Sequence, residues 1–189
     1  NLIGLFITDI IGRIKGSSVD NAIVVISLSI HPLAALLFMV ILAPIIEEYL
    51  FRKWLIDRTA AYGEGVSVLL SGLMFGLFHG NLNQFAYAFA LGLFFGFIYV
   101  KTGHIRYSIL LHMLVNLHGS VLSVQLLGLL DMDVLYAASQ NPEQMAAVLS
   151  SQLPQLFLLC IYFLAFFGIV IAGIILLIVR RKRFTCEKG

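Results

Sequence analysis

Five polar residues capable of acid–base or hydrogen-bonding chemistry lie within or at the ends of apolar stretches: Glu47, Glu48, His79, His112 and Asn116. An ionisable side chain at membrane depth costs at least about 2.5 kcal/mol on insertion scales, so such residues usually have a function. They occur in three short patterns, which are Glu-Glu-x-x-x-Arg (47–52), Phe-x-x-x-His (75–79) and His-x-x-x-Asn (112–116). Together the patterns predict a site that activates water inside a bilayer.

Two chemistries fit these residue types. In the first, a glutamate acts as general base on water, and His112 with Asn116 donates hydrogen bonds to the developing oxyanion. In the second, His79, His112 and a glutamate hold a zinc ion that lowers the pKa of a bound water. The His-Glu-x-x-His motif of many zinc proteases is absent. The spacing of the residues leaves both chemistries open.

The two adjacent glutamates are predicted to have different roles, since neighbouring residues on a helix point about 100° apart. Glu48 and Arg52 are four residues apart, in the favourable acid-before-base order, and we expect a structural ion pair between them. Glu47 then remains available as the base. Pro44 precedes both, and its ring is expected to disturb the carbonyl four residues back, at Val40, and so to kink the helix.

Composition identifies the class of protein that must position these residues. The 189 residues are 60% hydrophobic and 12% charged, with a mean hydropathy of +0.99. A soluble domain carries roughly 25% charged residues. Backbone groups that face lipid must be paired within the chain. The sequence therefore predicts an all-α, polytopic transmembrane helix bundle with an intramembrane polar active site, and no basic patch with aromatics suggests nucleic acid.

The hydrophobic pattern divides the chain into four parts. Residues 1–30 are predicted to be the end of an earlier span or an interfacial segment, residues 31–130 the catalytic intramembrane core, residues 131–152 an extracytoplasmic loop, and residues 153–189 the last span with a basic tail. Because the sequence starts with Asn1, we expect the chain to begin inside a longer protein.

The expected spans follow from apolar length, since about 20 residues are needed to cross the hydrocarbon core. They are 32–56, 84–100, 107–130 and 153–179, with 66–79 as a shorter, buried or part-crossing helix. Asn141 and Pro142, followed by Gln144, resemble a helix N-terminus with a capping box, and they predict a short amphipathic helix in the loop.

Basic residues predict the orientation, because they are enriched on the cytoplasmic side of membrane spans. The cluster Arg180–Arg183 places the C-terminus in the cytoplasm, and alternation places the segments 53–64 and 101–106 on the same side. Residues 131–152 contain no Lys or Arg, as expected outside.

Glycines recur four residues apart, at Gly72, Gly76 and Gly80 and again at Gly92 and Gly96. In membranes this spacing allows two helices to approach closely. A simple enrichment of glycine in membrane helices explains the same pattern equally well.

The three patterns, in order, resemble the CAAX protease and bacteriocin-processing family of intramembrane endopeptidases, which includes the Ras-converting endoprotease. The similarity covers roughly residues 32–120, in the segments Glu47–Arg52, Phe75–His79 and His112–Asn116. The resemblance implies that Glu47 with His79 activates the water, that His112 and Asn116 form the oxyanion hole, and that Glu48 and Arg52 support the site. It favours a metal-independent mechanism with no cofactor, although zinc at His79, His112 and Glu47 stays possible.

On these grounds we expect an endopeptidase that cleaves membrane-associated peptides or proteins, embedded in a bacterial cytoplasmic membrane. Two other classes compete with this interpretation. One is a non-catalytic bacteriocin-immunity or scaffold protein, against which the intact set of site residues argues. The other is a small transporter, for which paired broken helices in two related halves would be expected but are not found in the sequence.

Overall fold

The computed structural model describes residues 2–16 and 30–180. All regular elements in these ranges are helices, and four helices are long and apolar enough to cross a membrane: Pro32–Tyr62, Leu82–Thr102, Ile105–Leu127 and Leu153–Val179. The predicted all-α membrane bundle is confirmed, and the chain is an integral membrane protein. Residues 17–29 of the predicted N-terminal segment and the basic residues 181–183 lie outside the described part of the chain. The chain forms two compact units, which divide after Val121.

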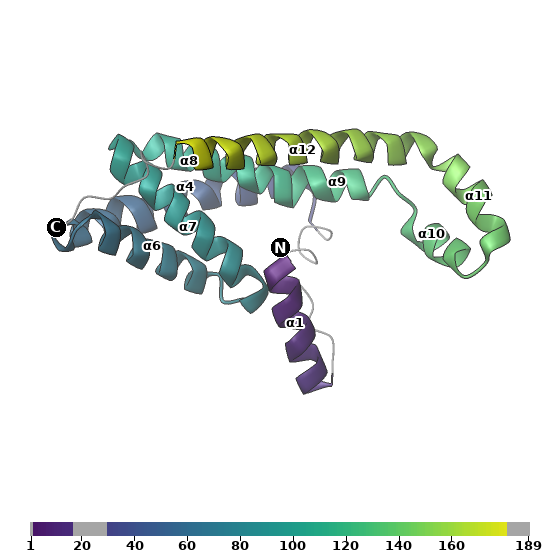
Figure 1. Cartoon of the computed structure of the whole chain (residues 1–189), viewed down its shortest axis with the longest axis horizontal. Coiled ribbons are helices and arrows are strands. Elements are labelled where there is room, and N and C mark those ends of the chain that lie inside the picture. The colour runs from purple at the N-terminus through teal and green to yellow at the C-terminus, as the bar shows by residue number, and fades with distance from the viewer. Residues whose placement is uncertain (1, 17–29, 181–189) are drawn as a thin grey trace. The chain divides into compact units, whose positions relative to one another are not determined.

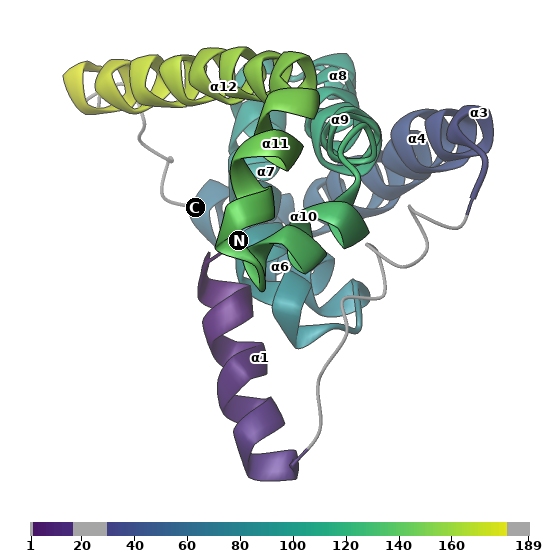
Figure 2. The same ribbon diagram turned by 90° about the vertical axis from the view of Figure 1, so that its right-hand side faces the viewer.

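The first spanning helix changes its winding along its length, and Figure 2 labels two of its segments, α3 and α4. In order it consists of α3 (Pro32–Ala35), π-helical η1 (Leu36–Leu42), α4 (Ala43–Glu48), π-helical η2 (Tyr49–Ile56), α5 (Asp57–Thr59) and 3₁₀-helical η3 (Ala60–Tyr62). The π-helical segments lie on both sides of α4, which carries Glu47 and Glu48. π-Helical turns are rare in proteins, and those that occur are often found at functional sites. The winding therefore marks the part of the helix around α4 as a candidate functional region.

A tight hairpin of two helices follows, and Figure 1 shows them side by side. It contains α6 (Glu64–Phe78) and α7 (Leu82–Thr102), joined by a turn in which Gly80 has a φ of 59°. The 15 residues of α6 rise about 22 Å, less than the roughly 30 Å hydrocarbon core, which agrees with the prediction of a part-crossing helix. The third spanning helix then begins with α8 (Ile105–Asn116) and continues through π-helical η4 (Leu117–Leu122) to α9 (Ser123–Leu127).

Two of the predicted glycine positions bring α6 and α7 into direct backbone contact. A Cβ atom added to Gly92 would lie 2.8 Å from the Cα of Gly72 and 3.1 Å from its carbonyl oxygen. A Cβ atom on Gly76 would lie 3.1 Å from the Cβ of Phe89. Gly80, by contrast, has no neighbour within 4 Å and serves the turn instead. The close approach of α6 to α7 therefore depends on Gly72 and Gly92.

Gly92→Ala is expected to lower the free energy of unfolding by about 1–3 kcal/mol, because the new methyl group meets backbone that cannot rotate away. Gly96→Ala is the matched control on the same helix, where the nearest atom to an added Cβ is a flexible Ile56 Cδ1 at 3.4 Å. Thermal unfolding of both variants in detergent measures the difference. Equal melting temperatures for the two variants would show that the contact with Gly72 is not limiting.

The N-terminal helix α1 (Leu2–Lys15) packs against α7 within the first unit. Asn83 Nδ2 donates a hydrogen bond to Thr8 Oγ1 at 3.4 Å, and both residues are buried. The segment predicted to precede the catalytic core is thus attached to it.

The second unit contains α9 and three further helices, α10 (Met132–Ser139), α11 (Pro142–Ser151) and α12 (Leu153–Val179). The predicted amphipathic helix is α11, and Asn141 Oδ1 accepts a hydrogen bond from the Glu143 amide at 3.3 Å. The helix α10 was not predicted. Gln152 contacts the N-cap of α10, since Gln152 Oε1 accepts a hydrogen bond from the Asp131 amide at 2.9 Å.

Candidate active site

Glu48 and Arg52 form an ion pair in the centre of the first unit. Arg52 Nε lies 3.0 Å from Glu48 Oε2, and both side chains are fully inaccessible, at 0% exposure. The predicted pairing of these two residues is confirmed. Its burial is deeper than the sequence indicated, and at such depth each charge depends on the other, since an unpaired buried charge is very costly.

Aromatic rings surround the Arg52 guanidinium. Its Cζ lies 4.6 Å from the ring centroid of Phe75, 5.6 Å from that of Phe95 and 6.0 Å from that of Phe51. Neither Nη1 nor Nη2 has a hydrogen-bond acceptor among the described residues. Ring faces attract a desolvated guanidinium, so the three phenylalanines stabilise the end of the Arg52 side chain that makes no hydrogen bond.

The second carboxylate oxygen of Glu48 binds a histidine from α8. Glu48 Oε1 lies 2.9 Å from His112 Nδ1. A carboxylate only accepts, so His112 donates from Nδ1, and the Nε2 of the neutral ring is left as an acceptor. A buried chain of contacts thus runs from Arg52 through Glu48 to His112. The link between Glu48 and His112 was missed at the sequence level, since 64 residues separate them and no spacing rule connects them.

Glu47 lies on the opposite side of the same imidazole. Its Oε2 is 3.8 Å from His112 Nε2, beyond hydrogen-bond distance, and a bond between the two would need both a small movement and a proton on one of these atoms. The Glu47 side chain is 18% exposed, whereas that of Glu48 is 0% exposed. The two glutamates therefore differ in environment: Glu48 contacts Arg52 and His112, and Glu47 is partly accessible.

His79 caps the C-terminal end of α6, and its ring orientation is fixed by the backbone. His79 Nδ1 lies 2.8 Å from the carbonyl oxygen of Phe75. Because a carbonyl accepts, Nδ1 carries the proton and Nε2 is an acceptor. The ring also packs edge-on against Phe75, with centroids 4.9 Å apart. His79 is half-buried, so its Nε2 can accept a hydrogen bond from a water molecule.

Phe75 brings the two histidines together. Its ring centroid is 4.9 Å from that of His79 and 5.4 Å from that of His112, in an edge-to-face arrangement with both. Phe95, from α7, stacks on His112 with ring centroids 5.2 Å apart. Phe75 entered the sequence analysis only as the start of a motif, and Phe95 did not enter it at all. Both restrict the motion of His112.

Asn116 lies one turn beyond His112 and binds the first spanning helix. Its Nδ2 donates to the carbonyl oxygen of Met39 at 2.8 Å. Pro44 has no N–H, and η1 is wound so that each carbonyl pairs five residues on, as Ala43 does with Phe38. The carbonyl that loses its partner is therefore that of Met39. The expectation that Pro44 would act on Val40 assumed α-helical spacing and was wrong by one residue.

The hydrogen bond to Met39 uses one of the two N–H groups of the Asn116 side chain. A carboxamide nitrogen has two hydrogens, and one of them is used by Met39. The other is available for a ligand, and the Met39 contact fixes the direction in which it points.

The residues of the zinc alternative do not form a metal cluster in this structure. In the ranges 2–16 and 30–180, no three side chains of His, Cys, Asp or Glu come together closely enough to hold an ion. His79 and His112 each have one ring nitrogen engaged and Nε2 left over. A zinc ion at Glu47, His79 and His112 would therefore require these side chains to move together.

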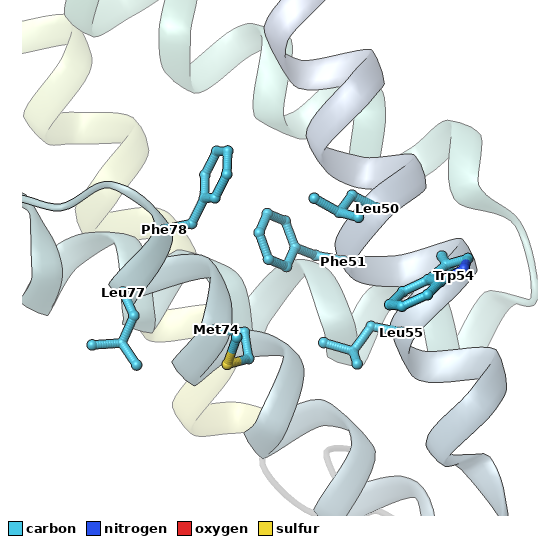
Figure 3. A pocket seen from close by; sticks show the side chains of 7 residues that line it. All are labelled: Leu50, Phe51, Trp54, Leu55, Met74, Leu77 and Phe78. Carbon is cyan, nitrogen blue, oxygen red and sulfur yellow. The ribbon is translucent and has the colours of Figure 1, made fainter.

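An apolar groove of about 380 Å³ lies beside His79. Figure 3 shows the seven side chains that line it, from η2 and α6: Leu50, Phe51, Trp54, Leu55, Met74, Leu77 and Phe78. Phe78 lines the groove and also neighbours His79, since its ring centroid is 5.4 Å from that of Phe51 and 6.5 Å from that of His79. Apolar ligand groups in this groove would contact Phe78, whose ring neighbours that of His79.

Comparisons with known proteins identify one family model and two similar bacterial membrane proteins. Residues 29–118 match the family described as type II CAAX prenyl endopeptidase Rce1-like. The chain is 29% identical over 133 residues to the membrane-embedded CAAX protease MroQ of Staphylococcus aureus (strain USA300), covering 67% of this chain and 52% of that protein. It is 34% identical over 80 residues to the putative membrane peptidase YdiL of Bacillus subtilis (strain 168), covering 40% of this chain and 32% of that protein. The matches thus span about half or less of the length of these relatives. No solved structure matches the chain.

Proposed function

We propose that the chain is an intramembrane endopeptidase with a glutamate base, because residues 29–118 match the Rce1-like family of CAAX endopeptidases and two bacterial membrane proteases are similar to the chain. The observation that carries the proposal is the placement of Glu47, 3.8 Å from a histidine that the buried Glu48 holds in one orientation. In this arrangement one carboxylate serves the structure and the other is free to accept a proton. A packing role alone would not require the second carboxylate.

In the proposed reaction, Glu47 and His79 Nε2 bind the attacking water. Glu47 removes one proton while the water oxygen forms a bond to the peptide carbonyl carbon. The carbonyl oxygen becomes an oxyanion, and the free N–H of Asn116 stabilises it. His112 contributes a second hydrogen bond in its imidazolium form, because only then does Nε2 carry a proton.

Breakdown of this intermediate completes the reaction. The carbon–nitrogen bond breaks, and the proton taken up by Glu47 passes to the leaving amine. The products are one carboxylic acid, which releases the second water proton to solvent, and one amine, and the Glu47 carboxylate is regenerated. The proposed substrate is a membrane-associated peptide or protein, because the site lies on helices that span the membrane. No cofactor takes part in the proposed steps.

The proposal is tested by peptide cleavage in proteoliposomes. The purified chain is reconstituted with membrane-anchored peptides, and the products are identified by mass spectrometry. Cleavage at defined bonds supports the proposal, whereas intact peptides with a folded chain would favour the immunity or scaffold alternative.

The apolar groove is proposed to hold an apolar part of the substrate next to the scissile bond. Met74→Trp should fill part of the 380 Å³ and raise KM severalfold, with little change in kcat. The matched control is Leu69→Trp, an exposed position on the same helix that does not line the groove. Steady-state kinetics on one peptide measure both constants. A lower kcat with unchanged KM would mean that the groove affects the site and not substrate binding.

The membrane is proposed to be a bacterial cytoplasmic membrane, with the C-terminus in the cytoplasm. Both relatives are bacterial, and Lys53, Arg58, Lys101 and Arg106 gather at one end of the spanning helices. Basic residues of this kind favour the cytoplasmic side.

A further inference from the structure

A polar cavity of about 230 Å³ lies at the turn between α7 and α8. The residues that line it are Lys53, Tyr99, Gly103, His104, Ile105 and Arg106. One spanning helix ends at Thr102 and the next begins at Ile105, so the turn lies where the hydrocarbon core gives way to lipid headgroups. None of the site residues described above lines this cavity.

The positive charge of this cavity comes mainly from Arg106. Lys53 is balanced by Asp57, since Nζ and Oδ2 are 2.8 Å apart, and Tyr99 donates to the same carboxylate at 2.7 Å. Arg106 has no carboxylate partner within the described ranges, and its side chain is exposed. The cavity therefore offers an uncompensated guanidinium to an anion.

An apolar groove of about 480 Å³ lies on the same pair of helices, lined by Ile98, Thr102, Tyr107, Leu110, Leu111 and Leu114. Its α8 residues are spaced 3, 4 and 7 apart and form a stripe about 10 Å long. Arg106 connects the groove to the polar cavity, because its Nη2 donates to Tyr107 Oη at 3.2 Å and its Cζ lies 5.0 Å from the Tyr107 ring.

We propose that this turn binds one anionic glycerophospholipid, with its phosphate at Arg106 and one acyl chain in the groove along α8. Arginine forms paired hydrogen bonds with phosphate oxygens, and basic pockets between membrane helices accommodate anionic headgroups. A soluble phosphate compound would use only the polar cavity, whereas a phospholipid fills both the cavity and the groove. The adjoining groove is therefore the feature that identifies the occupant as a lipid.

Native mass spectrometry of the delipidated full chain in detergent tests the proposal, with phosphatidylglycerol, phosphatidylcholine and glycerol 3-phosphate as probes. Arg106→Gln removes the anion contact, and Leu110→Trp blocks the groove. Arg58→Gln is the matched control, because Arg58 carries the same charge on an exposed surface, contacts Trp54 at 4.5 Å and does not line the cavity.

Phosphatidylglycerol should bind in preference to phosphatidylcholine, and glycerol 3-phosphate should not bind at the same concentration. Arg106→Gln should weaken phosphatidylglycerol binding on the order of fivefold to tenfold, Leu110→Trp should weaken it as well, and Arg58→Gln should leave it unchanged. Three results would each overturn the proposal: an equal loss in Arg58→Gln, equal binding of the two lipids, or binding of glycerol 3-phosphate as strong as that of the lipid.

Discussion

Glu47→Gln is expected to lower kcat at least about a hundredfold while leaving the protein folded, because the amide has the shape of the carboxylate but cannot take a proton. KM should change little, since the base acts in the transition state. Proteoliposome kinetics combined with thermal unfolding separate the two effects. The side chain is 18% exposed and makes its nearest ionic contact at 3.8 Å, so its loss removes no close ion pair.

Glu143→Gln is the matched control for this substitution. Glu143 is exposed in α11, in the second unit, and has no place in the proposed reaction. It should retain wild-type turnover. Wild-type turnover in purified Glu47→Gln would mean that Glu47 is not the base.

Glu48→Gln is expected to destabilise the fold by roughly 3–5 kcal/mol, because it leaves the fully buried Arg52 without its counter-charge. Activity should fall as well, since His112 loses the carboxylate that fixes its orientation. Thermal unfolding of the detergent-purified variant measures the first effect. This pattern is the reverse of that expected for Glu47, although the two residues are adjacent.

A double variant separates the two roles of Glu48. Glu48→Leu with Arg52→Met replaces both charges by apolar groups and should recover much of the lost stability, because no unpaired charge remains. Turnover should stay low, since His112 still lacks its acceptor. Recovery of turnover together with stability would show that Glu48 acts only through the fold.

The sequence predicted the helices well because apolar length and glycine spacing are local signals. The last span was predicted at Leu153–Val179, as found, and the first was predicted to start at Pro32. The Glu48–Arg52 pair also followed from local spacing, at four residues on one helix.

The contacts between distant helices could not be predicted from spacing. His112 meets Glu48 only because α8 packs against α4, and Phe95 reaches His112 from α7 without any motif of its own. Asn116 binds Met39 because the helix before Pro44 is π-helical. That winding depends on tertiary packing, which composition and periodicity do not report.

The most direct test of a carboxylate-activated water is to measure turnover and zinc content in the same sample of the reconstituted wild-type chain. We predict full turnover with far less than one zinc ion per chain, and no loss of turnover on treatment with a chelator. Turnover that disappears with the removal of one zinc ion per chain, and returns when zinc is restored, would contradict the account.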